Sequence, residues 1–449
     1  MLKGAGSAES DASPSSEEPP SPASAEECTA PASAACGKFP GRVRDGRWLD
    51  WRWHMKNRIR TIAQLRGRFP TLDVSSDTIQ AARKFPLAIT PYYASLIRRP
   101  DDADPIFRMC VPQAGELIDA AFLKDDPLEE AEDMPVPGLV HRYPDRALLL
   151  VTTTCSAYCR HCTRKRVAGM QESTISPAAL ERAVRYLAGH PEITDVILSG
   201  GDPFTMTTDA LERILAALRC VASIQVIRIG TRTPVVMPQR ITDELVAMLR
   251  RHHPVWVNTH FNHPHELTAE AAEACARLVD AGVPLGNQSV LLRGVNDRPE
   301  IVEELCRRLV RMRVRPYYLF QCDLVRGVEH FRTPLSRGLE IMEYLRGRLS
   351  GLAIPQFVVD APHGGGKIPL LPNYIVSMSP THTVLRNFEG LLVAYPEPGV
   401  RAEPASGAGG AAETAPGVYD LVSGKATAIR PARSARMRRR QMQALCRFE

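Results

Sequence analysis

The sequence predicts an α/β protein whose folded body is an open or partial (β/α) barrel. The first observation is a regular alternation, over residues 147–359, of short apolar runs with amphipathic stretches. Such alternation is typical of strands and helices that form βα units around a parallel sheet. The second observation is that polar motifs follow the ends of these runs, where parallel α/β folds bind ligands. About six or seven units favour a partial barrel over a flat doubly wound sheet, although periodicity alone leaves both open.

The expected elements follow from apolar content and from residues typical of helix starts. Ser176 before Pro177 and Thr208 before Asp209 are expected caps, because their hydroxyls can accept hydrogen bonds from free backbone N–H groups. The expected strands lie at residues 147–153, 195–198, 225–229, 255–258, 285–292, 316–320 and 356–359. The expected helices lie at residues 177–187, 209–218, 242–250, 269–280, 300–311 and 335–349.

Both ends of the chain differ in composition from its middle. The N-terminal segment is rich in Ser, Ala, Pro and Glu, and cannot bury enough apolar surface to become ordered. Before the barrel the chain looks largely helical, and after it short antiparallel strands are expected. The expected segments are a disordered extension (1–44), a helical region (45–135), the partial barrel with the site (136–372), a small β addition (373–397) and a disordered basic tail (398–449).

The overall composition is that of a globular enzyme in a reducing compartment. Of the 449 residues, 44% are hydrophobic and 24% charged, which is ordinary for a folded domain. The 11 cysteines are odd in number and scattered apart from one loop, so they do not indicate a disulfide framework. No secretory signal and no membrane-spanning run is recognisable. We therefore expect a cytoplasmic protein without membrane contact.

A basic run near the C-terminus accounts for most of the net charge of +6. Contact with nucleic acid or another polyanion is one interpretation of such a run. A solvated disordered tail is the favoured one, so a nucleic-acid partner is not expected. The basic residues of this run are Arg433, Arg436, Arg438, Arg439 and Arg440.

Three cysteines occupy eight residues directly after the first expected strand. Cys155, Cys159 and Cys162 in CSAYCRHC can hold three irons of a 4Fe–4S cluster and leave the fourth iron free for a small molecule. A zinc site is the main alternative, but it needs a fourth ligand, and His161 beside Cys162 closes a tetrahedron poorly. Three buried thiols without a metal are the third possibility. The spacing favours the open cluster.

The second expected strand ends in the turn SGGDP. Gly200 and Gly201 would let a ligand approach the backbone closely, and the Asp202 carboxylate offers an acceptor for an ammonium group. Taken alone, this sequence is better interpreted as a tight βα turn. Because the turn comes one strand after the cysteine loop, the interpretation as a ligand-binding turn is favoured.

Two further motifs offer groups for a phosphate-bearing cofactor. In DAPHGGGK, Lys367 ends a glycine loop after the last strand, and a partly buried lysine can form a Schiff base, most often with pyridoxal phosphate. A Walker loop is excluded because Ala361 and Ile368 stand where its first Gly and its Ser or Thr belong. In HRYPDR, two arginines can bind a phosphate and a tyrosine can lie against a pyridine ring. A surface turn and a solvated loop are the alternatives for these two motifs.

The cysteine loop followed by a Gly-Gly-acid turn resembles the radical S-adenosylmethionine enzymes. Over residues 48–395 the chain closely resembles lysine 2,3-aminomutase, a family of isomerases within that superfamily. The resemblance implies a partial barrel that binds a 4Fe–4S cluster, S-adenosylmethionine and pyridoxal phosphate. Eight motifs in the same order carry it: HRYPDR, CSAYCRHCTRKR, SGGDP, RTPVVMPQRIT, NTHFNHPHE, GNQSVLLRGVND, QCDLVRGVEHFRTP and DAPHGGGK.

The resemblance assigns roles to individual residues. Lys367 would carry pyridoxal phosphate as a Schiff base and be the catalytic residue, with Arg142, Tyr143 and Arg146 at the same cofactor. The implied reaction is hydrogen abstraction by a 5′-deoxyadenosyl radical and migration of the amino group from the α- to the β-carbon. An electron donor of the flavodoxin or ferredoxin type would reduce the cluster. The residues implied near S-adenosylmethionine are His161, Gly200, Gly201, Asp202, His260 and Gln288.

Three charged residues are implied to select the substrate. Arg164 would grip its carboxylate with two parallel hydrogen bonds, and Asp323 and Asp360 would bind the distal ammonium of lysine. Arginine is harder to exclude, because a guanidinium also satisfies paired carboxylates, whereas glutamate would be repelled. Taken alone, Asp323 is a helix cap or a surface acid. We expect an L-lysine 2,3-aminomutase, with an arginine 2,3-aminomutase and a non-catalytic metal-binding protein as the alternatives.

The chain departs from the family pattern in two places. Only Cys446 follows the expected catalytic lysine, so no structural zinc between subunits is expected, and a homodimer or tetramer remains open. His363 stands where relatives often have a fourth glycine, which narrows the freedom of the loop. The remaining cysteines are expected to be buried or incidental thiols: Cys28, Cys36, Cys110, Cys220, Cys275, Cys306 and Cys322.

Overall fold

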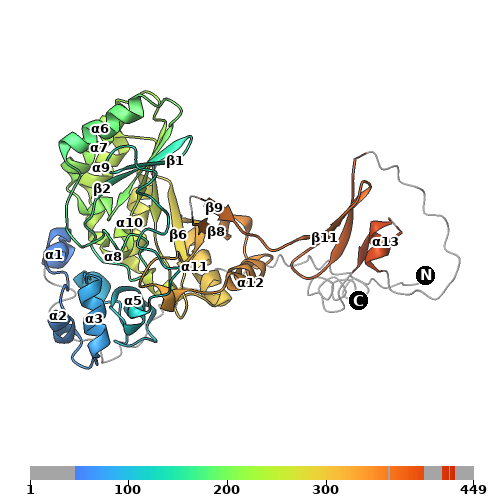
Figure 1. The fold of residues 1–449 in the computed structure, drawn as a ribbon, viewed down its shortest axis with the longest axis horizontal. Coiled ribbons are helices and arrows are strands. Elements are labelled where there is room, and N and C mark those ends of the chain that lie inside the picture. The colour runs from blue at the N-terminus through green and yellow to red at the C-terminus, as the bar shows by residue number, and fades with distance from the viewer. Residues whose placement is uncertain (1–45, 363–364, 399–416, 424, 430–449) are drawn as a thin grey trace, which may run out of the picture. The chain divides into compact units, whose positions relative to one another are not determined.

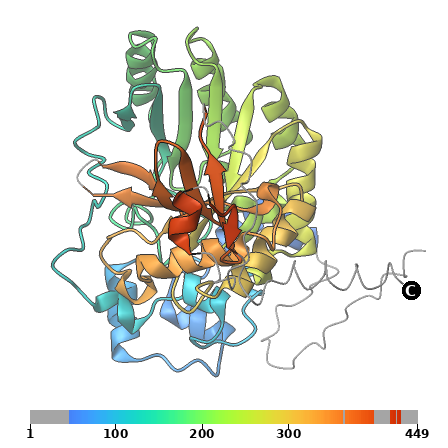
Figure 2. The same ribbon diagram turned by 90° about the vertical axis from the view of Figure 1, so that its right-hand side faces the viewer.

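The computed structural model describes residues 46–362, 365–398, 417–423 and 425–429. Its main feature is a nine-stranded sheet in which β1 to β9 follow one another in sequence order. The seven strands from β2 to β8 are parallel, and β1 and β9 pair antiparallel at the two edges. The sheet curls into a half-barrel with helices along its outer side (Figures 1 and 2). This confirms the predicted partial (β/α) barrel.

The elements of the barrel match the expected pattern closely. The strands are β1 (Leu139–Tyr143), β2 (Arg146–Thr152), β3 (Asp195–Gly200), β4 (Val226–Gly230), β5 (Val255–Thr259), β6 (Leu285–Leu291), β7 (Arg315–Gln321), β8 (Gln356–Ala361) and β9 (Gly366–Pro369). The intervening helices are α6 (Pro177–Ala188), α7 (Thr208–Arg219), α8 (Thr233–Val236), α9 (Asp243–Arg251), α10 (Ala269–Asp280), α11 (Pro299–Arg311) and α12 (Leu335–Leu345).

Helix caps fix where the helices begin. The Ser176 hydroxyl accepts a hydrogen bond from the backbone N–H of Ala179, as expected for the start of α6. Helix α7 begins one residue earlier than predicted, because the Thr207 hydroxyl accepts from the N–H of Ala210. Thr208 is therefore the first helical residue and not the cap, which corrects the prediction.

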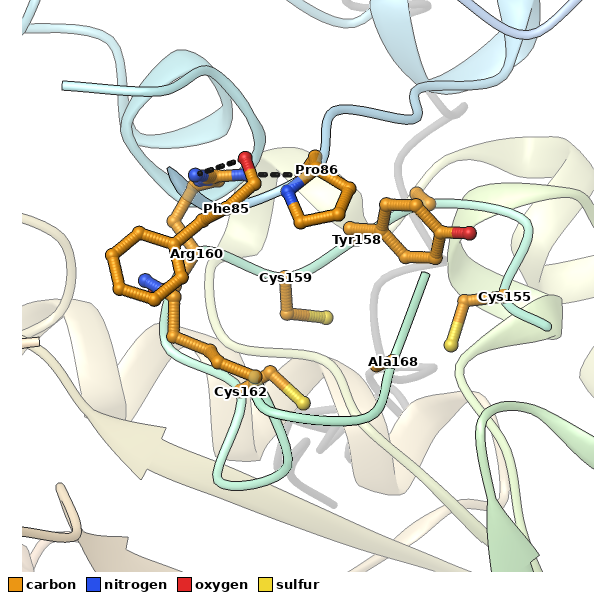
Figure 3. A pocket seen from close by; sticks show the side chains of 10 residues that line it. Phe85, Pro86, Cys155, Tyr158, Cys159, Arg160, Cys162 and Ala168 are labelled. Carbon is orange, nitrogen blue, oxygen red and sulfur yellow. Dashed lines mark hydrogen bonds between the residues drawn. The ribbon is translucent and has the colours of Figure 1, made fainter. Parts of the chain in front are cut away.

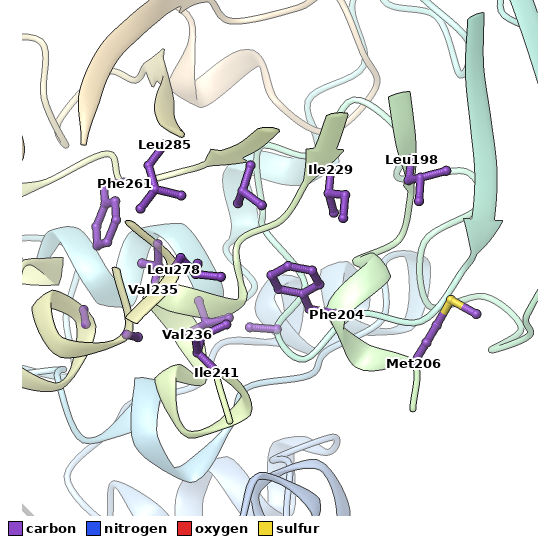
Figure 4. Packing of buried hydrophobic residues seen from close by; sticks show 14 of the residues in the cluster. Leu198, Phe204, Met206, Ile229, Val235, Val236, Ile241, Phe261, Leu278 and Leu285 are labelled. Atoms are coloured by element: carbon purple, nitrogen blue, oxygen red, sulfur yellow. The ribbon is translucent and has the colours of Figure 1, made fainter. Parts of the chain in front are cut away.

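The apolar core lies between the sheet and its helices (Figure 4). In β3, Val196 and Leu198 are fully buried while the alternating Ser199 is only partly buried, because successive side chains of a strand point to opposite faces. The side chains of Leu198 and Ile229, on neighbouring strands, point to the side of the sheet on which Phe204 and Val235 lie. Ser199 points to the other face, where its hydroxyl lies 3.3 Å from Arg164 Nη1, so the candidate site lies on that face.

The regions that flank the barrel differ from expectation in three ways. The N-terminal region contains short helices joined by turns: α1 (Trp51–Lys56), α2 (Ile62–Arg68), α3 (Ser76–Lys84), α4 (Pro91–Ala94) and α5 (Pro105–Cys110). Lys367 lies on the strand β9, whereas a loop was expected. The antiparallel addition is present as β10 (Ile375–Met378), β11 (His382–Arg386) and β12 (Leu392–Pro396), but it is extended by α13 (Val418–Val422) and β13 (Ala428–Ile429).

The helix α13 and the strand β13 lie in the segment that was predicted to be a disordered tail. Leu421 of α13 is fully buried, and β13 pairs with β12 through Leu392 and Val393. For residues 417–423 and 425–429 the prediction of disorder is therefore wrong. The expectations for residues 1–44, the loop residue His363, the basic run at 433–440 and Cys446 lie outside the described residues.

The cysteines outside the loop behave largely as expected. Cys110, Cys275, Cys306 and Cys322 are buried free thiols, and Cys220 is an exposed one. Cys28 and Cys36 lie outside the described residues. Within the described part of the chain, no helix combines the length and the apolar character that crossing a bilayer requires.

Candidate active site

The cysteine loop follows β2, and its three thiols surround one recess (Figure 3). The recess has an empty volume of about 360 Å³, counted to its open mouth, and is also lined by Tyr158 and Arg160. Burial raises the pKa of the Cys155 thiol well above its usual value, and burial together with the neighbouring Cys159 raises that of Cys162 to about 11. A bound metal is therefore what would hold these sulfurs as thiolates.

The arrangement fits a cluster better than a single ion. A zinc site needs all its ligand atoms within about 2.3 Å of one point. Among the described residues, no three His, Cys, Asp or Glu side chains are placed to hold one metal ion in this way. In a 4Fe–4S cluster each thiolate binds a different iron. Cys155, Cys159 and Cys162, set apart around a shared recess, meet that requirement.

The glycines of the SGGDP turn pack against the start of the cysteine loop. Gly200 has φ +115°, and a Cβ there would lie 2.3 Å from the carbonyl oxygen of Thr152. At Gly201 a Cβ would lie 2.3 Å from the carbonyl oxygen of Thr154. The N–H of Asp202 donates to this same carbonyl at 2.8 Å. The two glycines are thus required for the turn to dock on the loop that carries Cys155.

The Asp202 carboxylate was expected to accept a hydrogen bond from an ammonium group, but in the structure it accepts hydrogen bonds from other groups of the protein. Its Oδ1 accepts from the hydroxyl of Thr231 at 2.6 Å and the N–H of Phe204 at 3.0 Å. Its Oδ2 accepts from the N–H of Arg232 at 2.8 Å and the hydroxyl of Thr233 at 3.0 Å. Four hydrogen bonds use the capacity of a carboxylate. The Asp202 carboxylate therefore holds the turn to the end of β4, and its contact with S-adenosylmethionine stays a prediction.

The other side chains that were predicted near S-adenosylmethionine are His260, directly after β5, Gln288, in the middle of β6, and His161, within the cysteine loop. His260 contacts the backbone of Gln288, and burial lowers its pKa to about 4. Burial also lowers the pKa of His161, with further lowering by the nearby Arg232 and His260. The buried Nδ1 of His161 has no hydrogen-bond partner in the described structure. Two neutral imidazoles, one with an unused ring nitrogen, fit the neighbourhood of a bound organic cofactor.

Arg164 is held by a glutamate that the sequence did not single out. Its Nε and Nη2 donate to the Glu130 carboxylate at 3.0 and 2.6 Å, and Nη1 lies 3.3 Å from the Ser199 hydroxyl. Glu130 is 5% exposed. Nothing in its acidic surroundings, residues 125–133, distinguishes Glu130 from its neighbours. One edge of the guanidinium is thus occupied, and its orientation is fixed by a buried partner.

Lys367, Asp360 and Asp323 form one charged cluster at the ends of β7 and β8. The Lys367 Nζ donates to both oxygens of Asp360 at 2.9 Å and lies 5.2 Å from the centre of the Phe320 ring. Burial raises the pKa of Asp323 to about 6, although the hydroxyl of Thr163 donates to it. Asp360 raises this pKa further and Lys367 lowers it, so the three charges lie within electrostatic reach.

The HRYPDR motif forms the hairpin between β1 and β2. The hydroxyl of Tyr143 accepts a hydrogen bond at 3.0 Å from the backbone N–H of Lys367, and the guanidinium of Arg146 lies over the Tyr143 ring at 3.9 Å. Tyr143 thus contacts Lys367 and Arg146 contacts Tyr143, while their contact with pyridoxal phosphate stays a prediction. Arg142 differs, because its Nε donates to Asp133 at 2.6 Å and its Nη2 to the carbonyl oxygen of Leu128. In this structure Arg142 is therefore ion-paired and not a free phosphate ligand.

Two family models match this chain. Residues 149–306 match the family model of the Radical SAM superfamily, and residues 342–446 match that of Lysine-2,3-aminomutase. The chain is 54% identical to L-lysine 2,3-aminomutase of Clostridium subterminale, over 79% of this chain and 86% of the relative. It is 50% identical to L-lysine 2,3-aminomutase of Bacillus subtilis, over 79% and 76% respectively.

One relative with a different named substrate is also close. Glutamate 2,3-aminomutase of Clostridioides difficile is 45% identical over 77% of this chain and 82% of its own length. Among solved structures, that of Streptococcus suis SuiB bound to S-adenosylmethionine aligns with a TM-score of 0.38 and 14% identity, over 50% of this chain and 52% of that one. The matches to the aminomutases span most of the folded body. The chain therefore belongs to the lysine 2,3-aminomutase family and contains a radical SAM domain.

Proposed function

We propose that this protein interconverts L-lysine and L-β-lysine, moving the amino group between the α- and β-carbons while a hydrogen moves the opposite way. The observation that carries the proposal is the pair Asp323 and Asp360 beside Lys367, with Arg164 also close enough to Asp323 to influence its pKa. Two carboxylates near an arginine suit a substrate with a carboxylate at one end and a cation at the other.

The cofactors of the proposed reaction are a 4Fe–4S cluster, S-adenosylmethionine and pyridoxal phosphate. When bound, they supply a carbon-centred radical and a ring that delocalises it. Cys155, Cys159 and Cys162 would hold the cluster in the recess they surround. Lys367 would hold pyridoxal phosphate through Nζ, whose side chain is 36% exposed and so remains accessible. Tyr143 fixes the backbone of Lys367 and would place its ring beside the cofactor.

The remaining side chains would bind the substrate and keep it oriented. Arg164 would bind the carboxylate with the guanidinium edge that Glu130 leaves open. Asp323 and Asp360 would bind the distal ammonium, and Lys367 Nζ marks the position of such a cation in the present structure. Lys367 must release Asp360 for this. The barrel walls would exclude water from a reactive carbon radical.

Substrate choice follows from charge. Glutamate would bring a third carboxylate towards Asp323 and Asp360, which is repulsive in a poorly solvated site. Arginine remains the second candidate, because a guanidinium matches paired carboxylates. A non-catalytic metal-binding protein is disfavoured, since it would not need Lys367 and an arginine placed around a shared site.

The deciding experiment is anaerobic turnover of the reconstituted, reduced protein with lysine, arginine and glutamate in parallel. We expect a β-amino acid from lysine, little from arginine and none from glutamate. Product from arginine without product from lysine would overturn the substrate. Lys367→Ala should abolish the near-visible absorbance of bound pyridoxal phosphate, while Lys425→Ala, at an exposed site on the β addition, should retain it. Absorbance that survives Lys367→Ala would remove this lysine from the cofactor site.

The protein also needs partners. We propose a one-electron donor of the flavodoxin or ferredoxin type for the cluster, and a homodimer or tetramer. Support for association comes from apolar side chains that are 45–71% exposed on and around β9, β10 and β12, among them Ile368, Ile375, Met378 and Tyr395. Free thiols throughout the described chain fit a reducing cytoplasm. Light scattering of the purified protein tests association, and a monomer would contradict it.

A further inference from the structure

We propose that Arg232 sets the reduction potential of the cluster through a charged hydrogen bond to the sulfur of Cys159. The guanidinium Nη1 of Arg232 lies 2.8 Å from the Cys159 Sγ. This inference rests on the cluster assigned above, and it gives a function to the motif RTPVVMPQRIT, in which Arg232 is the first residue. The sequence alone offered no role for this arginine.

Arg232 is held so that only one end of its fork faces the sulfur. The Nη2 donates to Glu266 at 2.7 Å and to the hydroxyl of Tyr93 at 2.8 Å, and this hydroxyl donates onward to Glu266 at 2.7 Å. The backbone N–H of Arg232 donates to Asp202. The residue is 7% exposed, and Glu266 is fully buried. Contacts at three points therefore aim Nη1 at Cys159 without dependence on solvent.

The charge of the cluster determines the sign of the effect. A 4Fe–4S core of charge +2 bound by three thiolates carries a net charge of −1, and one added electron makes it −2. A buried cation at a ligand sulfur stabilises the more negative form more strongly, and hydrogen bonds to the sulfurs also set cluster potentials. Arg232 should therefore raise the potential and ease the uptake of the electron that a low-potential donor protein supplies.

The recess around the three cysteines is also lined by other positively charged side chains. Arg160 and Lys165 line it together with the cysteines, and both are bonded to the single carboxylate of Glu116, at 2.6 and 2.8 Å. All three side chains are at most 5% exposed. Two cations against one anion leave a buried excess of positive charge next to the cluster. Arg232 differs from this pair because it contacts a ligand sulfur directly.

The experiment compares the cluster potentials of variants by redox titration with EPR detection, using the reconstituted full-length protein without substrate. We expect Arg232→Gln to lower the equilibrium constant for reduction at least tenfold, which is about 59 mV for one electron. The matched control is Arg240→Gln. Arg240 is also fully buried, but it donates to the carbonyl oxygens of Phe204 and Met206, so the potential should not change.

Four outcomes decide the matter. Full iron content with a wild-type potential in Arg232→Gln overturns the proposal, whereas loss of the EPR signal from the wild-type protein would instead refute the cluster itself. If Arg232→Gln does not load iron, Arg232→Lys replaces it in the titration. The lysine keeps a positive charge near Glu266 but cannot bind both Glu266 and the Cys159 sulfur, so the potential of the cluster should also fall. The unmodified protein labelled with ¹⁵N-arginine should show nitrogen coupling to the reduced cluster, and absence of coupling would exclude the hydrogen bond.

Discussion

Lys367 and Asp360 face each other across the hairpin of β8 and β9, with the lysine Nζ 2.9 Å from both carboxylate oxygens. The sequence resemblance gives these residues different ligands, a cofactor for the lysine and a substrate ammonium for the aspartate. In the structure they neutralise each other. The Lys367 ammonium thus occupies the place proposed for the substrate cation, and binding of cofactor and substrate must separate the pair.

Asp360→Asn should weaken lysine use without removing the cofactor. The substitution takes one of two negative charges from the proposed ammonium site, so we expect the KM for lysine to rise more than tenfold. The near-visible absorbance of pyridoxal phosphate should persist, because Lys367 is unchanged. Asp280→Asn is the control, since Asp280 makes an exposed ion pair with Arg313 that contributes little. An unaltered KM in Asp360→Asn would take Asp360 out of the substrate site.

Asp323 should link lysine use to pH. Its folded-state pKa of about 6 means that the carboxylate is increasingly protonated below this value and no longer attracts an ammonium. We expect kcat/KM for lysine to fall as the pH drops through about 6, since this quantity reports groups of the free enzyme. Asp323→Asn should have a low kcat/KM that lacks this step, with normal iron content. The same step in the variant would assign it to another group.

The Asp323 carboxylate should also lower the free energy of unfolding at pH values above its pKa. Burial raises the pKa of Asp323 from 3.8 to about 6, so the folded state binds the proton more tightly than the unfolded state. Its favourable contribution is complete below about pH 4 and is lost as the pH rises through 6. Asp323→Asn should therefore be more stable than the wild type at pH 8, by up to about 3 kcal/mol, and nearly equal near pH 4. Denaturant unfolding at both pH values measures this, and a less stable variant at pH 8 would contradict it.

Glu130→Gln should loosen the grip of Arg164 on the substrate. The variant keeps the size of the side chain but loses the buried charge that fixes the guanidinium, an interaction of about 2 kcal/mol or more. We expect the KM for lysine to rise at least tenfold, with a smaller change in kcat. Glu181→Gln, in an exposed helical ion pair, is the control. A fall in kcat alone would indicate that Glu130 does not act through substrate binding.

Gly201→Ala should impair the loading of the cluster. The new Cβ would lie 2.3 Å from the carbonyl oxygen of Thr154, a backbone atom that can move only with the start of the cysteine loop. We expect a lower iron content per chain and a lower melting temperature. Gly351→Ala has open space around its Cβ and should retain both. Full iron content in Gly201→Ala would show that the loop tolerates the shift.

Much of the barrel was predictable because its signals are local. Residues 269–280 were predicted as a helix, and the structure has α10 at the same bounds, since apolar spacing and a threonine cap act within a few turns. The edge strand β9 and the ordered segment around α13 were missed. The four-residue strand β9 is stabilised by pairing with β8, and α13 by burying Leu421. Segments of four or five residues are too short to show a clear apolar period, so their sequences do not reveal these contacts.

The three cysteines and the order of the eight motifs can be read from the sequence alone, and they were enough to identify the family and its cofactors. Which charges neutralise one another was decided only by the tertiary structure. Glu130 contacts Arg164, Arg232 contacts Cys159, and the Asp202 carboxylate accepts hydrogen bonds from Thr231 and Arg232. These pairings join residues that lie tens of positions apart in the chain. Burial excludes competing water from them, so the fold, and not the local sequence, determines which partner each charge finds.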